Sequence, residues 1–76
     1  MKPLILQLAR GLVREPGKVR VHEYVEGERT ILELEVAPGD LGRVIGRDGR
    51  TASALRVLAG ALARRRGREL ELEILD

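Results

Sequence analysis

Two stretches of alternating apolar and charged residues constrain the fold of this chain more than any other feature. One face of residues 30–37 carries Leu32, Leu34 and Val36. Residues 69–74 repeat the pattern, with three glutamates opposite Leu70, Leu72 and Ile74. Successive side chains of a strand point to opposite faces of a sheet, so both stretches are predicted as half-buried strands. The residues between them have helical spacing, and such crossovers are right-handed, so we expect the two strands to lie parallel.

A helix and a further strand are predicted ahead of this pair. Pro3 suits the first turn of a helix, which is expected to end at the breaker Pro16-Gly17. Its apolar positions are Leu4, Ile5, Leu8, Leu12 and Val13. Residues 18–25 are predicted as a strand. Its inward positions are Val19, Val21 and Val25, and its outward positions are Arg20, His22 and Tyr24. Because Glu26-Gly27-Glu28 offers a turn, this strand and residues 30–37 are predicted to form an antiparallel hairpin.

Two helices are predicted between the parallel strands. Pro38 and Gly39 break the strand before them, and Asp40 is expected to cap a short helix over residues 41–45. A longer helix is predicted from Arg50 to about Arg66, with Gly67 as its stop. Its expected buried stripe consists of Ala52, Leu55, Leu58, Ala59 and Leu62.

The predicted fold class is therefore α+β, with one domain over residues 1–76 in the order helix, strand, strand, helix, helix, strand. The sheet is expected to be mixed and three-stranded. Three helices can cover only one of its faces, which leaves the other in water or against a partner. That open face is predicted to carry Arg20, Glu33, Glu35, Glu69, Glu71 and Glu73.

Composition excludes several classes of function. The chain has no cysteine, which removes disulfides, thiol catalysis and cysteine-based zinc sites. His22 is the only histidine, so we expect no metal site and no other cofactor. The only serine, Ser53, lacks the partners of a catalytic triad, so neither an enzyme nor a small-molecule substrate is predicted. No apolar run is long enough for a signal peptide or membrane span, and we expect a cytoplasmic protein with no membrane partner.

Charge is unevenly distributed along the chain. The net charge is +2, yet residues 42–68 contain eight arginines and a single acid, Asp48, and so carry +7, which leaves −5 for the remainder. The arginines are Arg43, Arg47, Arg50, Arg56, Arg64, Arg65, Arg66 and Arg68. This asymmetry is more informative than the total charge.

The corner between the two inner helices has the sequence Gly46-Arg47-Asp48-Gly49. Joining two helices in a few residues requires sharp backbone torsions, which glycine adopts without a Cβ penalty. The first amides of the following helix have no internal partners, and the helix dipole places partial positive charge there, so phosphate is the expected occupant. Arg43 and Arg50 flank the corner and could contact successive phosphates. Asp48 is expected beside the phosphate path, where it could cap the long helix.

The segment Val44-Ile45-Gly46-Arg47-Asp48-Gly49 resembles the I-G-x-x-G signature of the KH domain, whose loop clamps a four-nucleotide stretch of single-stranded nucleic acid. The element order is similar to the type II KH topology. Two features resemble the KhpA family of small bacterial KH proteins: residues 40–45, which lead into the corner, and the first helix. This resemblance implies an RNA-binding protein or RNA chaperone that can form a homodimer or pair with a second KH protein, KhpB. Ala52 departs from the bulky aliphatic residue of the general KH pattern.

The resemblance implies an RNA-binding surface around the corner. We expect its residues to be Gly42, Arg43, Val44, Ile45, Gly46, Arg47, Asp48, Gly49, Arg50 and Arg56. A KH groove holds bases against aliphatic side chains, and about one of Leu41, Val44 and Ile45 is expected to reach that surface, with the others in the core. Arg56 is expected at the edge of the groove. The arginines of residues 64–68 lie about 20 Å along the helix from the corner and favour a role as cations at a helix C-terminus over RNA contact.

A second function stays open at this point, namely a protein-interaction module that keeps the KH fold and acts mainly through dimerisation. The two functions differ in their response to salt. Contacts to about three or four phosphates of a single strand predict a log–log slope of binding constant against salt near −2 to −3, whereas apolar protein binding predicts little slope.

Overall fold

The computed structural model describes all residues 1–76 and has the predicted α+β order. The helices are α1 (Lys2–Leu12), α2 (Leu41–Ile45) and α3 (Arg50–Arg65), and the strands are β1 (Arg20–Glu26), β2 (Arg29–Glu35) and β3 (Glu69–Ile74). Single turns of 3₁₀ helix, η1 (Pro16–Lys18), η2 (Pro38–Asp40) and η3 (Arg47–Gly49), precede β1, α2 and α3 respectively. No helix is both long and apolar enough to cross a membrane.

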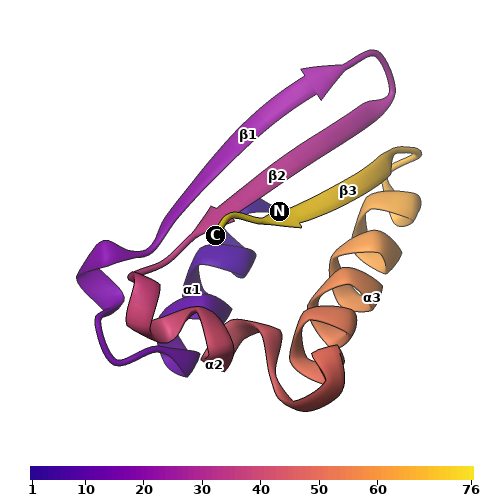
Figure 1. Ribbon diagram of the computed structural model, residues 1–76. Helices are drawn as coiled ribbons and strands as arrows, with labels where there is room; N and C mark the ends of the chain where they lie inside the picture. The colour runs from indigo at the N-terminus through magenta and orange to yellow at the C-terminus, as the bar shows by residue number, and fades with distance from the viewer.

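The sheet has the predicted topology. Its strand order is β1-β2-β3, with β1 antiparallel to β2 and β3 parallel to β2. Arg29 of β2 pairs with Glu69 of β3, and Leu32 pairs with Leu72, so the apolar positions of the two strands share one face. All three helices lie on that face (Figure 1). The crossover through α2 and α3 brings the corner to one end of the molecule (Figure 1).

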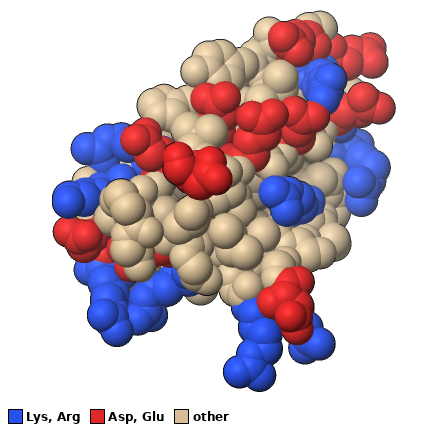
Figure 2. All heavy atoms as spheres, in the orientation of Figure 1, with Lys and Arg blue, Asp and Glu red and all other residues tan.

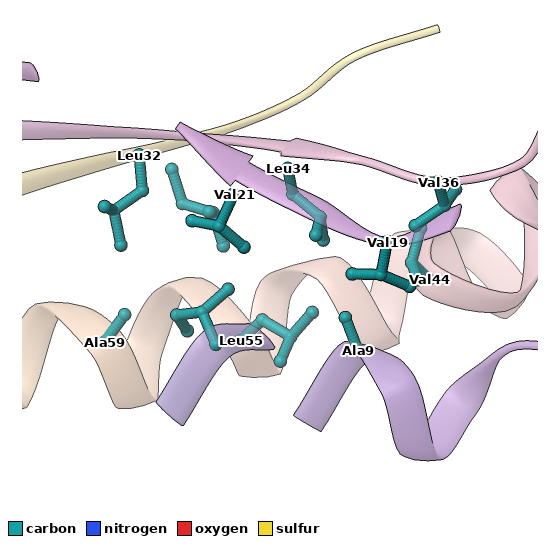
Figure 3. Close-up of a cluster of buried hydrophobic side chains, with 11 residues drawn as sticks. Ala9, Val19, Val21, Leu32, Leu34, Val36, Val44, Leu55 and Ala59 are labelled. Atoms are coloured by element: carbon teal, nitrogen blue, oxygen red, sulfur yellow. The ribbon is translucent and has the colours of Figure 1, made fainter. Parts of the chain in front are cut away.

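The core between the sheet and the helices is entirely aliphatic. Leu32 and Leu34 of β2 are fully buried, as are Ile5 of α1 and Val44 of α2. Figure 3 shows the strand side chains pointing down onto Leu55 and Ala59 of α3 and Ala9 of α1. Small alanines on the helices let α1 and α3 approach the sheet closely, so the core closes without an aromatic side chain, and Tyr24 lies exposed outside it.

The first helix is shorter than predicted, because it ends at Leu12 and not at Pro16-Gly17. Val13 is extended, and the next two amides donate hydrogen bonds to a side chain instead of continuing the helix. The acceptor is Asp40, whose Oδ1 and Oδ2 lie 3.1 and 3.0 Å from the backbone nitrogens of Arg14 and Glu15. The predicted cap is therefore wrong as well: Asp40 makes no side-chain cap bond to α2 and instead joins it to the segment after α1.

Two apolar residues predicted to face inward are largely exposed. Val25 near the end of β1 is 63% exposed, at the tip of the hairpin. Leu58 is 45% exposed, because the buried stripe of α3 runs through Ala52, Leu55, Ala59 and Ala63 and Leu58 lies one residue off it. Leu62 is half-buried for the same reason. The stripe of α3 that faces the sheet is thus made mostly of alanine.

The end of α3 agrees with the prediction at Gly67. This glycine has φ of 69°, its amide donates to the carbonyl of Arg64, and the amide of Arg68 donates to the carbonyl of Ala63. These two bonds are the Schellman arrangement, which a left-handed residue after the helix makes possible. The chain consequently reverses at once from α3 into β3.

Candidate nucleic-acid interface

The corner is a tight left-handed turn. Gly46, Asp48 and Gly49 have φ of 77°, 55° and 73°, and Asp48 is the only residue other than glycine with positive φ. A Cβ at Gly46 would lie 2.2 Å from Oγ1 of Thr51, so glycine is required there by space as well as by torsion. Asp is among the few residues that tolerate the left-handed region. The sequence of the corner therefore matches its backbone at each position.

Internal hydrogen bonds hold the corner in shape. The amide of Gly46 donates to the carbonyl of Gly42 at 2.9 Å, and the amide of Gly49 donates to the carbonyl of Gly46 at 3.1 Å. No side chain caps α3, so the suggested capping role of Asp48 is wrong. The amide of Arg50, the first residue of α3, donates to the carbonyl of Arg47. The partial positive charge of the helix dipole at this end still favours an anion.

Basic side chains surround the corner and are free to move. Arg47 and Arg50 are exposed and take part in no ion pair. Arg43 is also exposed, with its Nε 3.8 Å from Oδ1 of Asp40. The corner projects at the lower end of the molecule in Figure 1, and Figure 2 shows basic groups beside one acidic group at that end. Arg47 and Arg50 can turn toward a phosphate without breaking an ion pair, whereas Arg43 would have to leave its contact with Asp40.

One of the three apolar candidates for the groove floor reaches the surface. Val44 is completely buried in the core and Leu41 is half-buried against it, whereas Ile45 is 37% exposed. Val44 was among the predicted RNA-binding residues. Its side chain is buried, so it packs in the core below the corner and does not reach the surface. Gly42 is exposed, which leaves open surface beside Ile45. In Figure 2 an uncharged area lies between the basic tip and the acidic groups of the sheet.

Arg56 lies at the seam between α3 and β3, and its place at the edge of an RNA groove stays a prediction. Its Nε donates to the carbonyl of Leu72 at 3.1 Å. A cleft of about 500 Å³ opens beside it, and its α3 wall also includes Gly60 and Arg64. Gly60 and Arg64 were not among the predicted RNA-binding residues. The spacing of four residues from Arg56 to Gly60 and from Gly60 to Arg64 would have placed all three on one face of a helix.

A protein-family model described as the KH domain of KhpA and KhpB matches residues 2–74. This chain belongs to the KhpA/KhpB KH-domain family. Curated relatives named RNA-binding protein KhpA match along all or nearly all of their length. That of Halalkalibacterium halodurans is 45% identical over all of both chains, and that of Aquifex aeolicus is 46% identical over this whole chain and 96% of its own. That of Clostridium perfringens is 41% identical over 99% of this chain and all of its own. No solved structure matches the chain.

In this member of the KhpA/KhpB family, the four arginines after residue 63 differ in their surroundings. Arg68 binds the hairpin, because its Nε donates to Oγ1 of Thr30 at 2.8 Å and its Nη2 donates to the carbonyl of Gly27 at 3.2 Å. Arg64 lines the cleft between α3 and β3. Arg66 and Arg68 line a second cavity, and Arg65 lines neither of the two. Arg68 is therefore structural, and Arg64 is the arginine of this group that the cleft makes available to a ligand.

The open face of the sheet is acidic, as predicted, and Figure 2 shows its acidic groups as a band above the uncharged area. A hydrogen bond to Glu71, with repulsion from that carboxylate, raises the pKa of Glu73. The same hydrogen bond lowers the pKa of Glu71, which also pairs with Arg29. His22 lies 3.3 Å from Glu35 on this face. Phosphate is thus repelled from the sheet and attracted to the corner.

Proposed function

We propose that this chain binds single-stranded RNA and that the corner of residues 46–49 holds its backbone. The relatives that span the whole chain are named RNA-binding proteins. The observation that carries the proposal is the left-handed turn of Gly46, Asp48 and Gly49 at an uncapped helix N-terminus. Backbone amides at such a terminus bind phosphate without reading the base.

The exposed arginines supply the remaining phosphate contacts. Arg47 and Arg50 have no competing ion pair, and Arg43 has only a long contact to Asp40. Ile45 offers apolar surface to a base. This contact takes the place of base stacking, because the chain has no exposed aromatic ring near the corner. We expect contacts to about three or four phosphates and a log–log salt slope near −2 to −3.

The substitution Arg47→Asp tests this proposal. It puts a second carboxylate beside Asp48 at the tip of the corner, in an exposed position outside the core. We expect the affinity for mixed-sequence single-stranded RNA to fall about tenfold or more, because one cation is lost and an anion is gained in the phosphate path. Fluorescence anisotropy measures the affinity, and circular dichroism checks that the fold is intact.

Arg10→Asp is the matched control, since it makes the same change of charge at an exposed position of α1 whose side chain takes part in no ion pair. Its effect on RNA affinity should be several times smaller. Equal losses in the two variants would mean that only the net charge matters, and unchanged binding by Arg47→Asp would rule out the corner as the phosphate clamp.

We also propose that the chain works with a second KH module, as a homodimer or with a KhpB-type partner. A contact to four nucleotides is weak, and a linked second module raises affinity through effective concentration. An apolar area on α3 and α1 could form the contact, because Val57 is 67% exposed and Leu58 and Leu12 are exposed beside it. Weak and reversible RNA contacts also suit an RNA chaperone.

Two further expectations belong to this proposal. The whole of residues 1–76 acts as one KH domain, of which the matched family model covers residues 2–74. The chain acts as a binding protein and not as an enzyme, in keeping with the names of its relatives, and its place of action is the cytoplasm, where RNA is available.

A further inference from the structure

Thr51, the second residue of α3, packs against the first glycine of the corner. A Cβ at Gly46 would meet Oγ1, Cβ and the backbone nitrogen of Thr51 at 2.2, 2.7 and 2.9 Å. No other glycine of the chain is approached so closely, and a Cβ at Gly49 would have no neighbour within 4 Å. Thr51 therefore occupies the space beside Gly46 that a side chain would need.

The same threonine also faces an apolar part of the molecule. It is half-buried, and it is the only polar residue among the six that line a hollow between α1 and α3. The apolar members are Leu8, Leu12, Ala54, Leu55 and Leu58. Because Oγ1 is the atom nearest to the Cβ position of Gly46, the methyl group is the branch left for the hollow. One side chain thus connects the corner to the leucines of α1.

The corner has few other restraints. Two of its four residues are glycines, which adopt many backbone torsions, and it projects from the core between α2 and α3 (Figure 1). Backbone hydrogen bonds to the carbonyls of Gly42, Gly46 and Arg47 hold it, and no side-chain hydrogen bond does so. A β-branched side chain is stiff at χ1, so Thr51 presents a fixed shape to Gly46.

We propose that Thr51 is a positioning residue for RNA binding. Its side chain, wedged between Gly46 and the leucines of α1, keeps the corner in the left-handed shape that meets the RNA backbone. Thr51 acts on the RNA only through the corner. A corner that is already ordered loses less conformational entropy on binding, so it binds more tightly. This inference rests on the proposed function, because it names what holds the same corner ready for its ligand.

Three substitutions at Thr51 separate its shape from its hydroxyl group. Thr51→Ala removes both branches and should weaken binding of single-stranded RNA about fivefold or more, because the corner then has its binding shape for only part of the time. Thr51→Val keeps the branched shape and its stiff χ1, so its affinity should stay within about twofold of the wild type. Thr51→Ser keeps the hydroxyl group alone and should bind with an affinity between those of alanine and valine.

Three further measurements distinguish positioning from a general loss of stability. In the free protein, the NMR order parameters of the Arg47 and Gly49 amides should fall from about 0.85 to below about 0.6 in Thr51→Ala and stay unchanged in Thr51→Val. The melting temperature of Thr51→Ala should change little, because the better helix propensity of alanine offsets the lost methyl contact. The salt slope of RNA binding should keep its wild-type value, because no phosphate contact is lost.

Ser53→Ala is the matched control. It removes a hydroxyl group from an exposed position near the start of α3, and Ser53 lines a different hollow from Thr51. RNA affinity and the order of the corner should both be those of the wild type.

Equal losses of affinity in Thr51→Ala and Ser53→Ala would overturn the inference, as would a corner that stays ordered in free Thr51→Ala. If Thr51→Val binds as weakly as Thr51→Ala while Thr51→Ser binds like the wild type, the hydroxyl group is itself an RNA ligand and Thr51 is not a positioning residue. If Arg47→Asp weakens binding and Thr51→Ala does not, only the role of Thr51 is refuted. If Arg47→Asp leaves RNA affinity unchanged, the proposed function itself is wrong.

Discussion

At the residue scale, Asp40 is the side chain that most fixes the position of the corner. Its carboxylate is only 2% exposed and accepts hydrogen bonds from two amides that lie 25 and 26 residues away in the sequence. Buried carboxylates are stable only when hydrogen bonds replace their hydration, which these two amides provide, and Arg43 adds an ion-pair contact at 3.8 Å. The short helix that leads into the corner is thereby anchored to the rest of the protein at its first residue.

Replacing this carboxylate by an amide should therefore destabilise the fold. In Asp40→Asn, one oxygen becomes an NH₂ group that faces a backbone N–H, so one charged hydrogen bond is lost and a donor is left against a donor. We expect the free energy of unfolding to fall by about 1.5–3 kcal/mol. Urea unfolding followed by circular dichroism measures this loss.

Asp48→Asn makes the same change of charge at an exposed residue, and asparagine also tolerates the left-handed conformation. Its stability should stay within about 0.5 kcal/mol of the wild type. If the two variants unfold alike, Asp40 is not an anchor and its hydrogen bonds contribute nothing beyond those to water.

At the scale of the elements, sequence patterns predicted the type and order of every α-helix and strand, but not the three single turns of 3₁₀ helix. Alternation identified β2 and β3 because one face of each is buried, and Gly67 marked the end of α3 correctly. The errors came from tertiary contacts that no local pattern contains. Asp40 was predicted as a helix cap, but its side chain binds the segment after α1. Leu58 fitted the predicted buried stripe of α3, but the packing of α3 on the sheet decides which face of the helix is buried.

The same limit applies to the candidate interface. The two glycines predicted the corner, because left-handed torsions leave a local signature in the sequence. The cleft was not predicted, since it depends on β3 lying beside Gly60 and Arg64, and that proximity is a property of the fold alone.

The exposed apolar side of α3 has a testable consequence for assembly. Val57→Glu puts a charge in the centre of the area that we propose for the dimer contact, so the variant should be monomeric at concentrations at which the wild type is dimeric. Val25→Glu is the matched control, because Val25 is 63% exposed and Val57 is 67% exposed.

Sedimentation equilibrium measures the dissociation constants of both variants, and we expect at least about a tenfold weakening for Val57→Glu alone. A wild type that stays monomeric at every concentration, or a loss of dimer in both variants, would contradict an α3 contact.

At the scale of the whole molecule, we expect charge separation to orient the RNA. Most of the arginines lie on the helices or at the corner, although Arg20 and Arg29 are on strands. The acidic groups of the open sheet face form a band (Figure 2). Clefts and faces of one sign steer charged ligands before contact, and the effect weakens as salt is added. The net charge is only +2, yet we expect RNA to approach the protein from the side of the corner and not from the open sheet face.

Reversing part of the acidic face should remove this preference. In Glu33→Lys/Glu35→Lys we expect RNA to bind the open sheet as well, so that binding at low salt persists even when Arg47→Asp is added. Chemical-shift mapping would place the new contacts on β1 and β2. If the triple variant does not bind RNA at low salt, the sheet is unsuitable for RNA for reasons other than its charge.

The parallel pairing of β2 with β3 also has a consequence for the order of folding. Arg29 pairs with Glu69, far along the chain, so the sheet is complete only when β3 has joined it. Closing so long a loop is slow, and the corner lies inside it. A chain that has formed the Gly46–Gly49 turn but has not yet paired β3 therefore lacks the wall against which α3 is held, and we expect it to bind RNA firmly only after that pairing.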